Sequence, residues 1–120
     1  MSQTPVIAIV DDDGSVREAM RGLLRAIGYA TEEFPSAEEF LQSKRLNDVA
    51  CLITDLQLGG MSGLELQKHL TGLGSRIPII VISAFSDERE RALIAGAIDF
   101  LGKPVTKEDL LRCIRVALER

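Results

Sequence analysis

Short apolar runs alternate with amphipathic segments along the whole chain. Most of these runs are rich in aliphatic or β-branched residues and end at polar residues or a Gly-rich turn, which is typical of strands buried in a parallel sheet. They predict strands at residues 6–10, 29–34, 50–55, 78–83 and 98–101. The run at 29–34 is more polar than the others, which indicates a strand at the edge of the sheet.

Helices are predicted between these runs. After the first run, apolar residues recur at helical spacing, as at Val16, Met20 and Leu24. A Ser or Thr followed three residues later by an acidic residue is a common signature of a helix start. The pairs that fit it are Ser15–Glu18, Ser36–Glu39, Ser62–Glu65 and Thr106–Asp109, and Ser86 is expected to start the remaining helix.

Alternating strands and helices with short links determine the expected fold class. They predict an α/β fold, a parallel five-stranded sheet covered by helices on both faces. We expect one flavodoxin-like (βα)5 domain, a three-layer sandwich over residues 1–120, because no internal repeat or linker interrupts the pattern. In the strand order 2-1-3-4-5, the first and third strands flank the point where the order reverses, which is where such sheets bind ligands.

Composition and charge exclude several classes of function. The 120 residues are 46% hydrophobic with a net charge of -4, which allows one core and does not favour a nucleic-acid surface. Basic residues near the C-terminal end alternate with acids, as on a solvated helix face. No apolar stretch reaches the roughly 20 residues of a membrane helix, and no signal peptide opens the chain.

The cysteines add a prediction about environment. Cys51 and Cys113 stand in apolar surroundings, and their spacing matches no metal site. We therefore expect buried free thiols. With no signal peptide, this indicates a cytoplasmic location.

Reactive side chains follow the predicted strands, at the edge where ligands bind. Carboxylates about 4 Å apart repel by roughly 4 kcal/mol at an effective dielectric constant near 20, and a hard cation such as Mg²⁺ relieves this repulsion. Because an Asp carboxylate is a known nucleophile toward phosphoryl groups, Asp55 is the predicted phosphoryl acceptor. Asp13 is expected to be an acid at the start of a helix instead. The strand-end residues are Asp11, Asp12, Asp13, Asp55, Ser83 and Lys103.

Four motifs in this order carry a family resemblance. They are Ile9-Val10-Asp11-Asp12, Thr54-Asp55 with Met61-Ser62-Gly63, Val81-Ile82-Ser83-Ala84, and Asp99-Phe100-Leu101-Gly102-Lys103-Pro104. Over nearly its whole length the chain resembles the receiver domain of bacterial two-component response regulators. Each motif lies at a strand end, which makes the combination far more specific than any one motif alone.

The resemblance implies a role for each site residue. Asp55 takes a phosphoryl group from a phosphohistidine, and Asp12 binds Mg²⁺ (or Mn²⁺) directly while Asp11 does so through water. The backbone carbonyl of Gln57 is a further metal ligand, and Asp55 itself contacts the ion. The remaining implied roles are a phosphoryl contact and switch at Ser83, a phosphoryl contact at Lys103, an inward rotation of Phe100, and a cis peptide at Lys103-Pro104.

The resemblance also implies partners. The phosphodonor is a sensor histidine kinase or a phosphotransfer protein. The chain is either a stand-alone receiver or the front of a longer regulator, in this family often a transcription factor, whose output domain would follow residue 120. The domain is not an enzyme, although it assists its own phosphotransfer and dephosphorylation, and it binds neither a membrane nor nucleic acid directly. The face made by the fourth helix, fifth strand and fifth helix is the switching face and a candidate homodimer surface. The residues expected on this face include Ile98, Phe100, Leu111 and Arg115.

This chain departs from the family pattern in a few places. Leu58 and Gly59 stand where the family usually has Met and Pro, and Gly59 with Gly60 is expected to loosen the loop after Asp55. Phe85 is large and apolar for a position facing the site. We expect it to shield the phosphoryl group from water.

Two alternatives remain open from the sequence. Asp11 to Val16 also resembles the first motif of haloacid-dehalogenase-type phosphatases, with Asp11 as nucleophile. That family needs an acidic strand end after its lysine, whereas here Asp55 precedes Ser83 and Lys103. The other alternative is a receiver-like binding module that is never phosphorylated. A calcium loop is excluded because Gly14 comes too early after the Asp run.

Overall fold

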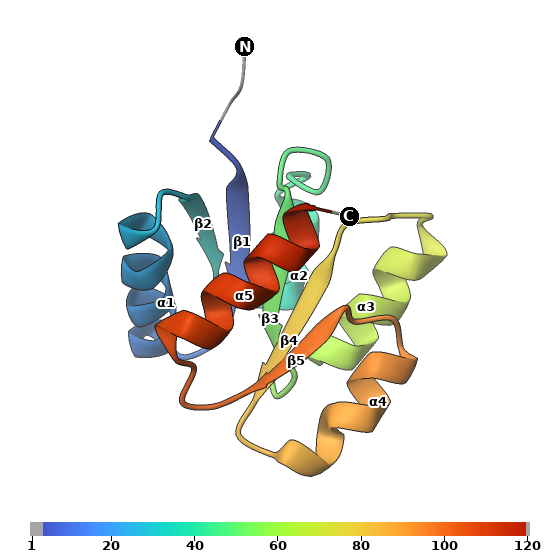
Figure 1. Cartoon of the computed structure of the whole chain (residues 1–120). Helices are drawn as coiled ribbons and strands as arrows, with labels where there is room; N and C mark the ends of the chain where they lie inside the picture. The colour runs from blue at the N-terminus through green and yellow to red at the C-terminus, as the bar shows by residue number, and fades with distance from the viewer. Residues whose placement is uncertain (1–3, 120) are drawn as a thin grey trace.

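A parallel five-stranded sheet forms the centre of the molecule (Figure 1). The computed structural model describes residues 4–119. The strands pair in the order β2-β1-β3-β4-β5, and all neighbours are parallel. This confirms the predicted fold class and places the polar second strand at an edge. The strands are β1 Val6–Val10, β2 Ala30–Phe34, β3 Cys51–Asp55, β4 Ile79–Ser83 and β5 Asp99–Gly102.

Helices cover both faces of the sheet, as the alternation predicted. On one face, strand residues such as Val10 and Val81 pack with Phe40 and Leu66. The other face packs against α1 and α5 through a second buried cluster. Burying an aliphatic side chain of this size contributes about 2 kcal/mol. The helices are α1 Gly14–Ala26, α2 Ala37–Gln42, α3 Gly63–Gly72, α4 Arg89–Ile94 and α5 Lys107–Leu118, and a 3-10 turn at Ser86–Glu88 precedes α4.

The observed helix starts correct two predictions. The N-cap of α1 is Asp13, whose carboxylate accepts the Ser15 N–H at 2.9 Å. The predicted Ser15–Glu18 capping box was therefore wrong, because Asp13, two residues earlier, caps the first turn of the helix and Ser15 lies inside it. Asp13 has its expected role at the start of this helix. The fourth helix begins at Arg89 rather than at Ser86, because the intervening residues form a 3-10 turn.

The other predicted caps are confirmed. Ser36 and Thr106 each accept a backbone N–H in the first turn of their helices. Ser62 and Glu65 form a complete capping box at the start of α3, with both reciprocal bonds present. This box fixes where the loop after Asp55 ends and α3 begins.

The cysteines are free and buried, as predicted. The Cys113 thiol donates to Asp99 Oδ2 at 3.0 Å. Burial is the main cause that raises the pKa of each thiol to about 12. Neither thiol is therefore ionised near neutral pH.

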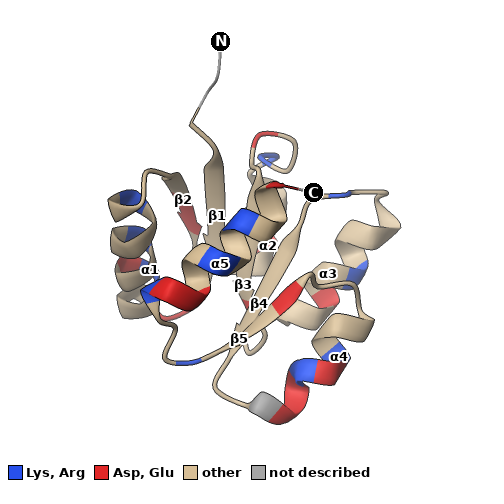
Figure 2. Ribbon diagram, in the orientation of Figure 1, with Lys and Arg blue, Asp and Glu red and all other residues tan. Residues whose placement is uncertain are grey.

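Acidic and basic residues are interspersed on the helices, as the ribbon shows on α1, α4 and α5 (Figure 2). Asp87 and Glu88 lie in the 3-10 turn, and α4 then begins with Arg89, Glu90 and Arg91. No helix within residues 4–119 is long and apolar enough to cross a membrane.

Candidate functional site

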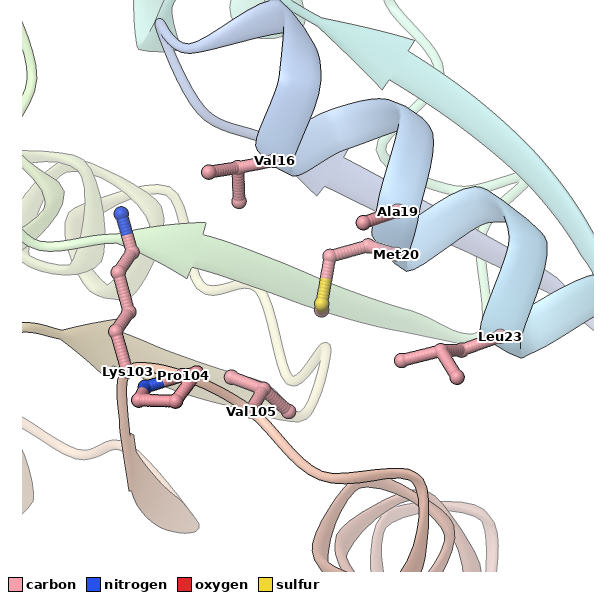
Figure 3. Close-up of a pocket in the computed structure, with 7 residues that line it drawn as sticks. All are labelled: Val16, Ala19, Met20, Leu23, Lys103, Pro104 and Val105. Carbon is pink, nitrogen blue, oxygen red and sulfur yellow. The ribbon is translucent and has the colours of Figure 1, made fainter.

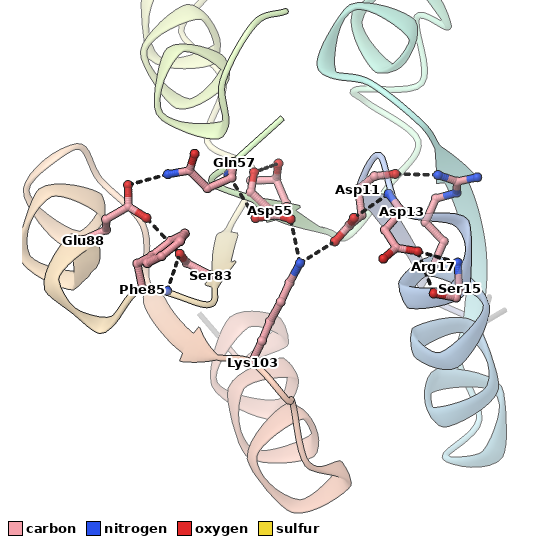
Figure 4. Close-up of polar contacts among 11 residues, drawn as sticks. Asp11, Asp13, Ser15, Arg17, Asp55, Gln57, Ser83, Phe85, Glu88 and Lys103 are labelled. Atoms are coloured by element: carbon pink, nitrogen blue, oxygen red, sulfur yellow. Dashed lines mark hydrogen bonds and ion pairs between the residues drawn. The ribbon is translucent and has the colours of Figure 1, made fainter. Parts of the chain in front are cut away.

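The ends of four strands bring the predicted site residues together (Figure 4). Asp55 is the last residue of β3 and Ser83 the last of β4, while Asp11 directly follows β1. Lys103 follows β5 and extends its ammonium group across to β3. Because β1, β3, β4 and β5 are parallel, all of these residues lie at the same rim of the sheet.

The carboxylates of Asp11, Asp12 and Asp55 form a cluster. One oxygen from each lies within 4.8 Å of the others. Asp11 is fully buried and Asp55 is 4% exposed, whereas Asp12 is exposed to solvent. Burial is the main cause that raises the pKa of Asp11; the Asp13 N–H opposes this rise and the charge of Asp55 adds to it.

The backbone fixes the orientation of Asp11. Its Oδ1 accepts the Asp13 N–H at 2.8 Å, and its carbonyl accepts a hydrogen bond from Arg17 Nη1 at 2.6 Å. Its Oδ2 is buried and accepts no hydrogen bond within the described part of the chain, although Lys103 Nζ lies 3.3 Å away. A buried oxygen of this kind, beside other carboxylates, suits a hard divalent cation.

Lys103 supplies the positive charge of the cluster. Its Nζ lies 2.7 Å from Asp55 Oδ2, and its side chain is 24% exposed. Burial lowers the pKa of Lys103, but the hydrogen bond that it donates to Asp55 and the negative charges of Asp55 and Asp11 outweigh burial and raise the pKa overall. Lys103 is therefore protonated at neutral pH. The Lys103–Pro104 peptide bond is cis.

The loop after β3 is held at several points. Asp55 Oδ1 accepts the Gln57 N–H at 3.0 Å, and Glu38 Oε2 accepts the Met61 N–H at 3.0 Å. Gly60 has a φ of 77°, a left-handed conformation that glycine adopts without strain. A Cβ at Gly63 would clash with the carbonyl oxygen of Asp55. Glycines in this loop thus allow a close turn, and Glu38 on α2 supports it.

The Ser83 hydroxyl forms its hydrogen bonds with residues other than Asp55 in this structure. Ser83 is fully buried. Its hydroxyl donates a hydrogen bond to Glu88 Oε1 at 2.9 Å and accepts one from the Phe85 N–H at 3.0 Å. Glu88 Oε2 accepts a hydrogen bond from Gln57 Nε2 at 2.8 Å. Glu88 is not among the site residues predicted from the sequence.

The predicted switch residue Phe100 is already buried. It is 5% exposed and belongs to the same cluster as Val81, Ala92 and Ala97. Phe85, in contrast, is 55% exposed. Rotation of Phe100 and shielding by Phe85 both remain predictions.

An apolar pocket lies beside Lys103 (Figure 3). Its volume is about 410 Å³, and it lies between α1 and the segment that follows β5. The stem of Lys103 forms part of its wall, so the pocket adjoins the carboxylate cluster. The lining residues are Val16, Ala19, Met20, Leu23, Lys103, Pro104 and Val105.

Comparison with known proteins identifies the family. The family model of the response regulator receiver domain matches residues 7–115. The chain belongs to this family. Receiver domains are signalling domains rather than classical enzymes, and they pair with sensor kinases and output domains. They generally bind Mg²⁺ at an acidic pocket, and this receiver domain has an Asp cluster at its rim.

Relatives and solved structures support the assignment. The response regulator protein TodT of Pseudomonas putida is 46% identical over 116 residues, which cover 95% of this chain and 51% of TodT. The transcriptional regulatory protein FixJ of Azorhizobium caulinodans is 34% identical over 122 residues, which cover 100% of this chain and 58% of FixJ. The receiver domain therefore spans about half the length of these curated relatives.

Structural similarity agrees with sequence similarity. The response regulator StyR matches with a TM-score of 0.89 at 44% identity, over 98% of this chain and 60% of StyR. The crystal structure of FixJ-N matches with a TM-score of 0.88 at 36% identity, over 99% and 97% of the two chains. The chain is thus the receiver domain of a two-component response regulator, and the phosphatase alternative is set aside.

Proposed function

We propose that residues 1–120 form one phosphoacceptor domain in which Asp55 accepts a phosphoryl group from a phosphohistidine. The donor is a sensor histidine kinase or a phosphotransfer protein. The observation that carries the proposal is the ion pair of 2.7 Å between Lys103 Nζ and Asp55 Oδ2, within a cluster that also holds Asp11 and Asp12. A carboxylate beside both a cation and further carboxylates that can bind a metal ion has what phosphoryl transfer requires, namely a nucleophile and positive charge for the phosphoryl oxygens.

The metal site of this proposal uses the same cluster. Asp11, Asp12, Asp55 and the backbone carbonyl of Gln57 are the residues that would hold Mg²⁺ or Mn²⁺. When bound, the ion supplies positive charge for the phosphoryl oxygens. The Oδ2 of Asp11 supports this assignment, because this buried oxygen accepts no hydrogen bond among the described residues and has only the Lys103 ammonium nearby, at 3.3 Å.

The reaction transfers one group between the two proteins. An Asp55 oxygen forms a bond to phosphorus while the phosphorus–nitrogen bond of the donor breaks, and the imidazole keeps the electron pair. Lys103 stabilises the negative charge on the phosphoryl oxygens. The apolar pocket is lined in part by Lys103, which pairs with Asp55, so a protein donor has an apolar surface to contact beside the site.

The signal then passes to the face made by α4, β5 and α5. Ser83 binds a phosphoryl oxygen and Phe100 changes its packing. As a result, the α4-β5-α5 face changes which partner it binds, and a second copy of the chain is one candidate partner. Because TodT and FixJ are about twice as long as this chain, we place an output domain beyond residue 120. FixJ is named as a transcriptional regulator. By analogy, the proposed output is transcription and the proposed location is the cytoplasm.

Incubation with acetyl phosphate and Mg²⁺, followed by intact mass measurement, tests this function. We expect a gain of one phosphoryl group that is absent in Asp55→Asn and after chelation. Asp48→Asn, which neutralises an exposed acid next to Arg45, is the matched control and should gain the group. Absence of the gain in the wild-type chain, together with no Mg²⁺-dependent binding of beryllofluoride, would favour the binding module that is never phosphorylated.

A further inference from the structure

Glu88 connects the loops that follow β3 and β4. Its Oε1 accepts a hydrogen bond from the Ser83 hydroxyl at 2.9 Å, and its Oε2 accepts one from Gln57 Nε2 at 2.8 Å (Figure 4). Glu88 occupies the N-cap position of α4, yet its side chain makes no capping hydrogen bond. Both carboxylate oxygens are therefore committed to the site rather than to the helix that Glu88 begins.

The bond to Glu88 uses the only proton of the Ser83 hydroxyl. A hydroxyl group donates one hydrogen bond, and its remaining capacity is to accept. In this structure Ser83 Oγ accepts from Phe85 N and donates to Glu88. No proton of Ser83 is left for a phosphoryl oxygen on Asp55 while this arrangement holds.

We propose that Glu88 is a positioning residue that holds the unphosphorylated state by competing with the phosphoryl group for the Ser83 hydroxyl. The inference rests on the proposed function of Asp55. Phosphorylation brings further negative charge to the site, and the Ser83 proton turns from Glu88 to a phosphoryl oxygen. Glu88 then loses one partner and faces the repulsion of that charge.

Release of Glu88 has a structural route. A pocket of about 200 Å³ lies beside it, lined in part by Gln57, Glu88 and Arg91. The Arg91 guanidinium offers the released carboxylate an alternative partner of opposite charge. Because Glu88 directly precedes α4 as its N-cap residue, the movement of its side chain carries the change at Ser83 to the start of that helix.

Beryllofluoride, a phosphoryl mimic, tests the competition in the presence of Mg²⁺. In Glu88→Ala the Ser83 proton is free, so we expect affinity for beryllofluoride to rise roughly tenfold over wild type, the scale of one charge-assisted hydrogen bond. Glu88→Gln keeps the shape and weakens the acceptor, so its affinity should fall between the two. Glu90→Ala removes the same charge from an exposed residue in the first turn of α4 and should match wild type.

A double-mutant cycle separates this role from a structural one. In a Ser83→Ala background Glu88→Ala should no longer change the affinity for beryllofluoride, because the contested proton is absent. The same gain with and without Ser83 would overturn the proposal, as would wild-type affinity in both Glu88 variants. If acetyl phosphate fails to label the wild-type chain at Asp55, the proposed function falls, and the role of Glu88 falls with it. Normal labelling with no effect of Glu88 overturns the role of Glu88 alone.

Discussion

On one side of Asp55, Lys103 is already paired with the proposed phosphoacceptor, at 2.7 Å. On the other side, Ser83 is bound to Glu88 rather than to Asp55. We call these the carboxylate side, made of Asp11, Asp12, Asp55 and Lys103, and the hydroxyl side, made of Ser83, Glu88 and Gln57. The proposed function requires both Lys103 and Ser83 to bind the same phosphoryl group.

The two sides differ in whether their hydrogen bonds and ion pairs have to change when a phosphoryl group binds. The carboxylate side is arranged before any phosphoryl group arrives, because the Lys103 ammonium offsets the repulsion between Asp11 and Asp55. The hydroxyl side is satisfied by its own hydrogen bonds and has to exchange one of them. Substitutions on the carboxylate side should therefore change whether phosphorylation occurs, and those on the hydroxyl side should change how long the phosphorylated state lasts.

Lys103→Met should have the largest effect. The variant keeps an unbranched side chain but removes the charge that pairs with Asp55 and Asp11. We expect the rate of phosphorylation by acetyl phosphate to fall roughly 100-fold, the scale for losing one preorganised charge contact. Intact mass measured over time gives the rate. Lys107→Met, on an exposed residue that begins α5, is the control, and equal rates in both variants would refute the role of Lys103.

Mg²⁺ should stabilise the fold through the carboxylate side only. At a concentration ten times its dissociation constant, a ligand that binds only the native state raises the free energy of unfolding by about 1.4 kcal/mol. We expect this gain in urea unfolding of the wild-type chain and its loss in Asp12→Asn, because Asp12 belongs to the cluster. Asp87→Asn neutralises an exposed acid in the 3-10 turn and should keep the gain. A gain that survives in Asp12→Asn would place the ion elsewhere.

Without metal, the carboxylate side should make stability depend on pH. The pKa of Asp11 is raised, chiefly by burial, so the folded state holds this proton more tightly than the unfolded state does. Its stabilising contribution is complete below the ordinary pKa of Asp and is lost as pH rises through the raised pKa. The Asn side chain of the Asp11→Asn variant does not ionise, so this variant lacks the contribution of Asp11 to the pH dependence.

Urea unfolding in a chelator at several pH values measures this dependence. The free energy of unfolding of Asp11→Asn, minus that of wild type, should increase as pH rises from below the ordinary Asp range toward neutral. Asn retains an oxygen for the Asp13 N–H, which limits other changes. If the difference in the free energy of unfolding stays constant with pH, burial does not raise the pKa of Asp11.

The carboxylate side was largely predictable from the sequence, whereas the hydroxyl side was not. Asp11, Asp55 and Lys103 each end or follow an apolar run, so their meeting required only the parallel sheet and its strand order. Ser83 was found for the same reason. Glu88 was missed because its contact depends on the 3-10 turn after β4, whose geometry no periodic pattern reveals.

The helix starts show a similar limit. Asp13 and Ser15 both suit an N-cap, and the pattern alone favoured Ser15 because Glu18 completes its capping box. The structure uses Asp13, whose carboxylate accepts from both the backbone N–H and the hydroxyl of Ser15. The local sequence therefore identified the helix but not which of these polar residues caps it, because that depends on where β1 ends and how the chain turns into α1.

Phe85→Ala should have the smallest effect, and it changes a residue that contacts the hydroxyl side through its backbone N–H. Ala keeps the backbone N–H that donates to Ser83, so only the aromatic ring is lost. If the ring excludes water from the phosphoryl group, loss of phosphate should accelerate about threefold, which corresponds to roughly 0.7 kcal/mol. The decay of the added mass after removal of acetyl phosphate measures this rate. Ile94→Ala, at an exposed apolar residue that ends α4, should decay like wild type. Slower decay in Phe85→Ala than in wild type would contradict shielding.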